Sequence, residues 1–183
     1  MSFPAFFDTN VLYGALLNDL ILELADRGLF RPLWSEDVLF ELGKNLVRNG
    51  EDRALVDKRI GAMKQYFTDA MVTGYELLVP RMTNHEKDRH VLAAAVRGGA
   101  EVLVTFNMRD FPAESLAPFD LDVVHPDDFL LDQLDLFYAP TLRALVELVD
   151  AYDSPAMTVD DLLLALTRAG VPRFAEAARA RLY

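Results

Sequence analysis

The chain carries four acidic side chains at positions where carboxylates could meet and bind a metal ion. They are Asp8, Glu41, Asp88 and Asp110. Asp8 and Asp110 come soon after short apolar runs, and Asp88 stands in line with the apolar stripe of the helical pattern that follows it. Carboxylates are rarely buried unless they are paired or bound to a metal. Each acid alone could be a helix cap or a solvated side chain, so their joint placement is what indicates a site.

Clustered carboxylates need a counter-charge. Two of them about 4 Å apart repel by roughly 4 kcal/mol at an effective dielectric constant of about 20. Either their pKa values rise or divalent cations bind among them. The chain has no cysteine, and no histidine stands at ligand spacing near each acid. An all-oxygen site favours Mg²⁺ or Mn²⁺ over Zn²⁺, and such a cation suits the hydrolysis of phosphodiester bonds.

The residues of this candidate site are expected to have different roles. Three acids are expected to be metal ligands: Asp8, Asp88 and Asp110. Glu41 is expected to be a fourth ligand or the base that orients a water molecule. Further polar residues are expected to form hydrogen bonds that hold the metal ligands or the phosphate in place: Asn10, Thr105 and Asn107.

Phosphate binding also requires cations near the acidic pocket. The candidate RNA contacts are Arg48, Arg89, Arg97 and Arg109. Arg89 and Arg109 are best placed, because they are neighbours of Asp88 and Asp110. Each of the four could equally be a solvated surface charge.

Five short apolar runs provide candidate strands that would position these residues. They are Ala5–Phe7, Phe30–Trp34, Tyr75–Val79, Val102–Val104 and Leu121–Val124. Helical patterns separate the runs, and this alternation predicts an α/β fold with a parallel sheet that is covered on both faces. In such sheets ligands bind outside the carboxyl ends of the strands, where the strand order reverses. The four acids are therefore expected to converge on one edge of the sheet.

The helices that carry two of the acids have recognisable ends. Ser35 is a good N-cap for the helix that contains Glu41, and Gly98-Gly99 ends the helix that begins at Asp88. Beyond about Asp135 the pattern is helical only, and Thr158 with Asp161 forms a capping-box pattern. We therefore divide the chain into residues 1–134, which carry the candidate site, and a helical C-terminal extension at residues 135–183.

Composition limits the function classes. The chain has 183 residues and a net charge of -11, which argues against a protein that coats nucleic acid in general but not against a nucleic-acid enzyme with an acidic metal site. The sequence lacks an apolar run of some 18 residues, which predicts no membrane span. Its N-terminus lacks the basic region of a signal peptide, so we expect a cytoplasmic protein.

Three segments resemble the PIN domain, a metal-dependent ribonuclease fold. FFDTNVL is similar to the family's opening strand end, and WSEDVLFELGK to the segment with the helix glutamate. KDRHVLAAAVRGGAEVLVTFNMRDF is close to the central signature, which is the most specific of the three. The resemblance spans roughly Phe3 to Leu131 and includes PDDFL at Pro126–Leu130. The helical tail lies outside the core signature.

The resemblance implies a particular fold and activity. It implies a three-layer fold with strand order 3-2-1-4-5, and a Mg²⁺ or Mn²⁺ site at the residues that match Asp8, Glu41, Asp88 and Asp110. The branch that looks most similar is the VapC-like toxins of type II toxin–antitoxin pairs. By that likeness the chain is an endoribonuclease that cuts RNA, is held by an antitoxin protein and forms a homodimer.

Other interpretations remain open at this point. His85-Glu86 and His90 suggest a zinc metalloprotease, but their spacing is one residue too long to place both rings on one helix face. A phosphatase of the haloacid dehalogenase type would need a second aspartate where Asn10 stands, and a receiver domain would need paired acids and a late lysine. The main alternative is a non-catalytic PIN-like module that binds RNA or protein.

Overall fold

A five-stranded parallel sheet forms the centre of the protein. The computed structural model describes residues 2–152 and 155–182. The strands are β1 (Pro4–Phe7), β2 (Arg31–Ser35), β3 (Met71–Val72), β4 (Val102–Val104) and β5 (Asp122–Val124). They pair in the order β3-β2-β1-β4-β5, which confirms the expected topology. The order reverses between β1 and β4, so the carboxyl ends of these two strands flank the expected ligand site.

The third strand is not where the sequence pattern predicted it. Met71–Val72 pairs with Trp34 and Ser35, whereas most of the predicted run Tyr75–Val79 lies in the 3₁₀ segment η2 (Glu76–Arg81). A short apolar run does not by itself distinguish a strand from a helical turn. Here Pro80 has no N–H to donate to a sheet, and Leu77 is 88% exposed rather than packed on a neighbouring strand.

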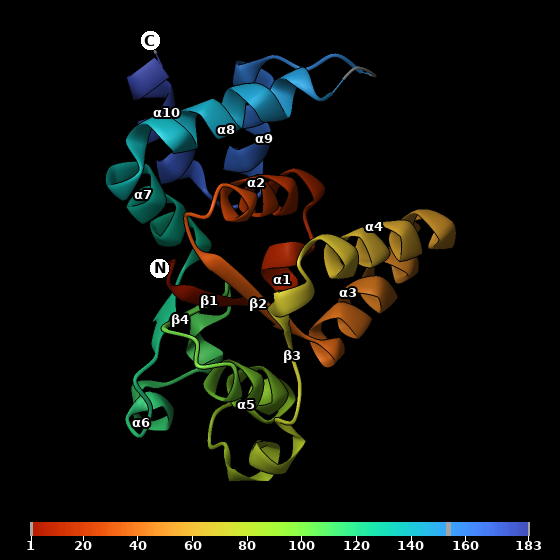
Figure 1. Ribbon diagram of the computed structural model, residues 1–183, viewed down its shortest axis with the longest axis vertical. Helices are drawn as coiled ribbons and strands as arrows, with labels where there is room; N and C mark the ends of the chain where they lie inside the picture. Colours follow the sequence, from red (N-terminus) through yellow and green to blue (C-terminus); the bar gives the residue numbers. More distant parts are fainter. Residues whose placement is uncertain (1, 153–154, 183) are drawn as a thin grey trace.

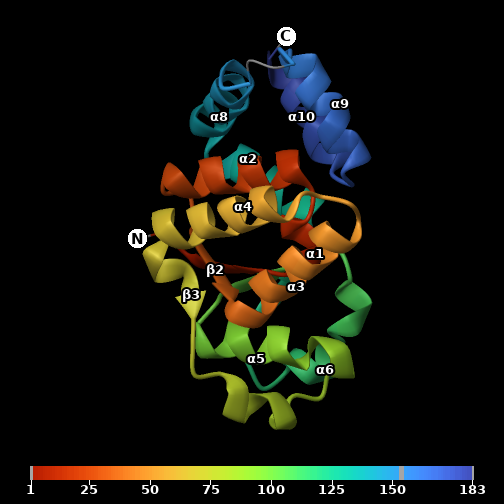
Figure 2. The same cartoon turned by 90° about the vertical axis from the view of Figure 1, so that its right-hand side faces the viewer.

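Helices cover both faces of the sheet, as Figures 1 and 2 show. One face carries α1 (Thr9–Leu12), α2 (Ala15–Asp26), α3 (Glu36–Arg48) and α4 (Arg53–Tyr66). The other carries α5 (Arg89–Arg97) and α6 (Ala113–Leu116). Short 3₁₀ turns complete the loops: η1 (Thr68–Ala70), η3 (Glu86–Asp88) and η4 (Met108–Asp110). This arrangement places the starts of α1 and α5 on opposite sides of one sheet edge.

Close packing fixes α5 on the sheet. A Cβ atom at Gly98 would lie 2.8 Å from Val72 Cγ2, so only glycine lets the end of this helix approach β3 at this distance. Gly99 follows with a φ of 63°, a left-handed conformation that glycine adopts readily. The Gly98-Gly99 pair thus ends α5 as predicted. It also determines the depth at which the helix beginning beside Asp88 sits on the sheet.

The C-terminal elements are helices, as expected. They are α7 (Pro126–Leu136), α8 (Tyr138–Asp150), α9 (Val159–Arg168) and α10 (Pro172–Leu182). They pack on one another, and α8 and α9 pack on α2 above the sheet (Figure 1). The capping box at the start of α9 is present, with Thr158 and Asp161 bonded reciprocally. The division of the chain after residue 134 stays a prediction, since α7 spans that position. None of the helices that the structure describes is long and apolar enough to cross a membrane.

Candidate metal centre

Asp8 is the buried centre of the site. It follows β1 and is the N-cap of α1, and its backbone N–H donates to the carbonyl of Val104 at the end of β4 (3.1 Å). Its Oδ1 accepts a hydrogen bond from the N–H of Thr9 (2.7 Å). Burial raises the pKa of Asp8, and the hydrogen bonds from Thr105 and Thr9 offset only part of this effect. The carboxylate is therefore held rigidly but lacks a full counter-charge.

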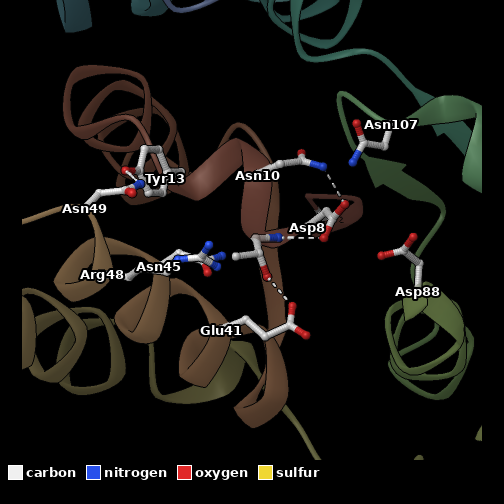
Figure 3. A pocket seen from close by; sticks show the side chains of 10 residues that line it. Asp8, Asn10, Tyr13, Glu41, Asn45, Arg48, Asn49, Asp88 and Asn107 are labelled. Atoms are coloured by element: carbon white, nitrogen blue, oxygen red, sulfur yellow. Dashed lines mark hydrogen bonds between the residues drawn. The ribbon is translucent and has the colours of Figure 1, made fainter.

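Two of the predicted supporting residues, Asn10 and Thr105, donate hydrogen bonds to Asp8. Its Oδ2 accepts hydrogen bonds from Thr105 Oγ1 (2.7 Å) and Asn10 Nδ2 (2.8 Å). The amide oxygen of Asn10 in turn accepts from the N–H of Phe106 (3.1 Å), which ties α1 to the loop after β4. The N–H of Asn107 donates to Thr105 Oγ1 (3.0 Å), while its side chain lines the cleft beside Asp8 (Figure 3).

Asp88 lies across the cleft from Asp8 and next to Asp110. Figure 3 shows the carboxylate of Asp88 turned toward Asp8. Asp88 is the N-cap residue of α5, but its side chain makes no capping hydrogen bond. Burial, together with the charges of Asp8 and Asp110, raises the pKa of Asp88 to about 6. This is the repulsion expected of clustered acids, and a bound cation would relieve it.

A histidine joins these acids, contrary to the sequence-based expectation. Ligand atoms of His85, Asp88 and Asp110 lie within 4.8 Å of one another, and His85 Nδ1 lies 3.7 Å from Asp88 Oδ2. The N–H of His85 donates to the carbonyl of Asp110 (3.0 Å), which links two loops that are distant in sequence. This backbone hydrogen bond brings His85 next to the two acids. The spacing of His85 from Asp88 in the sequence does not by itself predict that position. Asp8 and Glu41 lie outside this three-residue group.

Glu41 approaches the cleft from α3 and is held by two neighbours. Its Oε2 accepts from Thr9 Oγ1 (3.2 Å), and its Oε1 lies 3.3 Å from His90 Nε2. The contact with His90 is the main cause that lowers the pKa of Glu41, against a smaller effect of burial. Burial by itself lowers the pKa of His90, but the close contact with the negative charge of Glu41 outweighs it and raises that pKa. The sequence pattern suggested His90 only for a zinc site that its spacing disfavours, and it did not predict this pairing with Glu41.

The cleft has a volume of about 440 Å³ and extends well beyond the acids (Figure 3). It is lined by Asp8, Thr9, Asn10, Tyr13, Glu41, Asn45, Arg48, Asn49, Asp88 and Asn107. Of the four acids expected to converge, Asp8, Glu41 and Asp88 line this opening, whereas Asp110 does not. Asp88 also belongs to the group with His85 and Asp110, so it connects the cleft to that second cluster.

The four candidate arginines lie in different places. Arg48 lines the cleft. Arg89 turns its Nε toward the carbonyl of Asn84 (3.3 Å), and neither it nor Arg109 lines the cleft. Arg97 lies at the opposite end of α5 from Asp88, near Gly74. Contacts of Arg89 and Arg109 with RNA stay predictions.

The model of the PIN domain matches residues 4–109, which is more than half of the chain. The chain belongs to the PIN-domain family. The match includes strands β1 to β4 and, with them, Asp8, Glu41, Asp88 and Asn107, and it ends just before Asp110. This confirms the resemblance stated from the sequence.

The C-terminal helices of this PIN-domain protein also have a match. The model of the VapC50 C-terminal domain matches residues 126–180. A protein of Mycobacterium tuberculosis named "Putative ribonuclease VapC50" is 52% identical over 112 residues. The alignment covers 61% of this chain and 66% of that protein, just under two thirds of its length. No solved structure matched the chain.

Proposed function

We propose that this PIN-domain protein is a metal-dependent endoribonuclease and the toxin of a toxin–antitoxin pair. The observation that supports this most directly is the position of Asp88. It faces Asp8 across an open cleft, adjoins Asp110, and has a pKa raised to about 6 by burial and by these two acids. Such a concentration of negative charge at the switch point of a parallel sheet fits a site for a divalent cation and a phosphodiester.

The donor atoms suit a divalent cation. Asp8, Asp88 and Asp110 would hold it, with Glu41 as a further ligand or base, and Mg²⁺ or Mn²⁺ are the ions proposed. When bound, the cation supplies the positive charge that activates a water and stabilises the oxygen that leaves phosphorus. The imidazole of His85 lies beside two of these acids and adds a nitrogen donor. Because nitrogen ligands suit transition metals, Mn²⁺ should be tested alongside Mg²⁺.

The protein's own residues have defined roles in this proposal. The contact with His90 lowers the pKa of Glu41 and keeps its carboxylate ionised, which suits a metal ligand or a group that orients the attacking water by accepting its hydrogen bond. Thr9 and His90 fix the orientation of its two oxygens. Asn10 and Thr105 keep Asp8 in place, and the amide of Asn107 is available to a phosphate oxygen at the edge of the cleft.

The proposal also includes RNA as the substrate, an antitoxin as the partner and a homodimer as the assembly. The name of the 52% identical relative, a putative ribonuclease, supports RNA as the substrate, and the match to the VapC50 C-terminal domain supports the likeness to VapC-like toxins. The antitoxin and the homodimer rest on that likeness alone. The toxin role is tested by inducing the chain in a bacterial host and measuring growth. Wild type should arrest growth, and Asp8→Asn should not, at equal protein levels.

The nuclease activity is tested on total RNA with Mg²⁺, Mn²⁺ or EDTA. Asp8→Asn and Asp88→Asn should each abolish cleavage while the far-ultraviolet circular dichroism spectrum is retained. Asp122→Asn on the exposed side of β5 is the matched control and should cleave normally. Equal cleavage by wild type and both site variants would overturn the proposal. RNA binding without any cleavage in either metal would support the non-catalytic PIN-like module instead.

A further inference from the structure

The half of the cleft away from Asp88 has no part in the proposed chemistry. It is formed by Tyr13, Asn45, Arg48 and Asn49, which we call the Tyr13 end of the cleft. Figure 3 shows these side chains on the far side of Asp8 from Asp88. They come from the break between α1 and α2 and from the C-terminal part of α3. Their types are aromatic, amide and guanidinium, which are the groups that bind the base and phosphate of a nucleotide.

Helix α3 connects this end to the candidate base. Glu41, Asn45 and Arg48 are spaced four and three residues apart, so they lie on one face of the helix. With a rise of about 1.5 Å per residue, Arg48 lies roughly 10 Å along the axis from Glu41. A strand of RNA that places a phosphodiester beside Glu41 would therefore meet Asn45 and Arg48 as it continues along the cleft.

Tyr13 is held in place before any ligand binds. Its hydroxyl accepts a hydrogen bond from Asn49 Nδ2, which fixes the far end of the ring to α3. Its backbone is secured by Arg59, which donates to the carbonyl of the preceding Leu12 (2.5 Å). The side chain is half-buried and lines the cleft. An aromatic ring that is already ordered loses little conformational entropy when a base stacks on it.

Arg48 is one of the many lysines and arginines that make no ion pair with a carboxylate among the described residues, but its place in the cleft sets it apart. Arg27, Lys64 and Arg173 each pair with a carboxylate, as do Arg179 and Arg181. Within residues 2–152 and 155–182, Arg48 makes no such ion pair, and it is the only lysine or arginine that lines the cleft. In a chain with a net charge of -11, an unpaired guanidinium beside a strongly acidic site is suited to an anionic ligand.

We propose that the Tyr13 end of the cleft is a nucleotide-binding subsite for an unpaired residue of the RNA next to the cleaved bond. The base stacks on the ring of Tyr13, the guanidinium of Arg48 binds a phosphate, and the amide of Asn45 bonds to the sugar or base edge. A base can stack on protein only when it is free of its own helix, so the substrate is single-stranded at this position. This inference rests on the proposed nuclease function for the identity of the ligand.

Binding of a fluorescent oligoribonucleotide to the full chain in EDTA tests the subsite without cleavage. Tyr13→Ala should weaken binding by roughly 5- to 150-fold, the effect of losing one base–aromatic stack. Tyr13→Phe keeps the ring and should bind within about threefold of wild type. Arg48→Ala should weaken binding and reduce the slope of log affinity against log salt by about 0.7. The same sequence locked in a duplex should bind more weakly and be indifferent to Tyr13→Ala.

Matched controls exist on distant helices. Tyr66→Ala removes an aromatic ring that is 81% exposed on α4, and Arg143→Ala removes an exposed cation from α8. Both should bind as wild type does. If Tyr13→Ala and Arg48→Ala bind no worse than these controls, the subsite is overturned. If Tyr13→Phe is as weak as Tyr13→Ala, the bond to Asn49 rather than stacking is what matters, and the stacking role is overturned.

Cleavage measured in parallel separates this inference from the proposed function. RNA binding that depends on Tyr13 and Arg48, without cleavage in Mg²⁺ or Mn²⁺, would support the subsite and overturn the nuclease. Cleavage with an unchanged KM in both variants would support the nuclease and overturn the subsite. A wild-type chain that neither binds nor cuts the oligonucleotide would overturn both.

Discussion

Gly170, in the turn between α9 and α10, touches the ring of Phe106 in the loop that follows β4. A Cβ atom at Gly170 would lie 2.8 Å from Phe106 Cε1. The ring of Phe106 also packs edge-on against His125, with centroids 5.1 Å apart, and its backbone N–H donates to Asn10 (3.1 Å). The C-terminal helices are thus in direct contact with the loop that helps to position Asp8.

Gly170→Ala should therefore destabilise the protein. Gly170 has a φ of 97°, which is strained for alanine, and the added methyl group would overlap Phe106. We expect the free energy of unfolding to fall by about 1–3 kcal/mol, and RNA cleavage to fall because Phe106 and Asn10 shift. Urea denaturation measures the first effect.

Gly61→Ala in α4, where a Cβ meets nothing within 4 Å, should instead stabilise the protein by about 0.5–1 kcal/mol. Equal stability of the two variants would contradict the contact.

Asp88 should make the stability of the metal-free protein depend on pH. Its pKa rises from 3.8 to about 6 on folding, so between these values the folded protein binds more protons than the unfolded chain. The free energy of unfolding should consequently fall as the pH rises from 3.8 to about 6, and the raised pKa of Asp8 acts in the same direction. Asp88→Asn should flatten this dependence.

Urea titrations at a series of pH values in EDTA measure this effect. The stability of Asp122→Asn, a substitution at an exposed position of β5, should depend on pH as that of wild type does. Adding Mn²⁺ at pH 7 should raise the melting temperature of wild type much more than that of Asp88→Asn. A wild-type curve that rises steadily between pH 4 and 6 would be inconsistent with the repulsion of Asp88 by Asp8 and Asp110.

His90 should act on the site through Glu41. Loss of the imidazole leaves Thr9 as the remaining neighbour that orients the carboxylate. His90→Ala should lower Mn²⁺ affinity or kcat by about 10- to 100-fold, the usual effect of removing a residue that orients a ligand. Calorimetric titration with Mn²⁺ and cleavage kinetics measure the two quantities. His90→Gln, whose amide can still donate to Glu41, should recover part of the loss, and equal defects in both variants would argue against an orienting role.

Asp127 and Asp128 are adjacent in sequence but should differ in their effect on stability. Asp127 is buried, and its carboxylate accepts the backbone N–H groups of Arg173 (3.1 Å) and Phe174 (2.8 Å) at the start of α10. Asp127→Ala would leave these donors unpaired and should cost about 1–3 kcal/mol. Asp128 makes only a surface ion pair with Arg173, so Asp128→Ala should cost about 0–1 kcal/mol. Thermal unfolding of the two variants side by side decides this.

Several parts of the site could be predicted from local sequence patterns. Asp8 directly follows an apolar strand, and Asp88 begins an amphipathic helix that Gly98 ends, so each position is defined by its immediate neighbours. Alternation of strands and helices predicts a parallel sheet, and the resemblance to PIN domains supplied its order. Metal binding by Asp8, Glu41, Asp88 and Asp110 stays a prediction that the observed convergence supports.

Other features depend on contacts between residues far apart in the chain. His85 joins Asp88 and Asp110 through a backbone bond to the loop after β4, and His90 meets Glu41 across two helices. The strand Met71–Val72 is too short to show a pattern and exists because Trp34 and Ser35 offer it partners. Hydrophobic periodicity reports which face of an element is buried, but not which distant element covers it. Only the folded chain decides which polar groups share a cleft, because that depends on how the helices pack around the sheet.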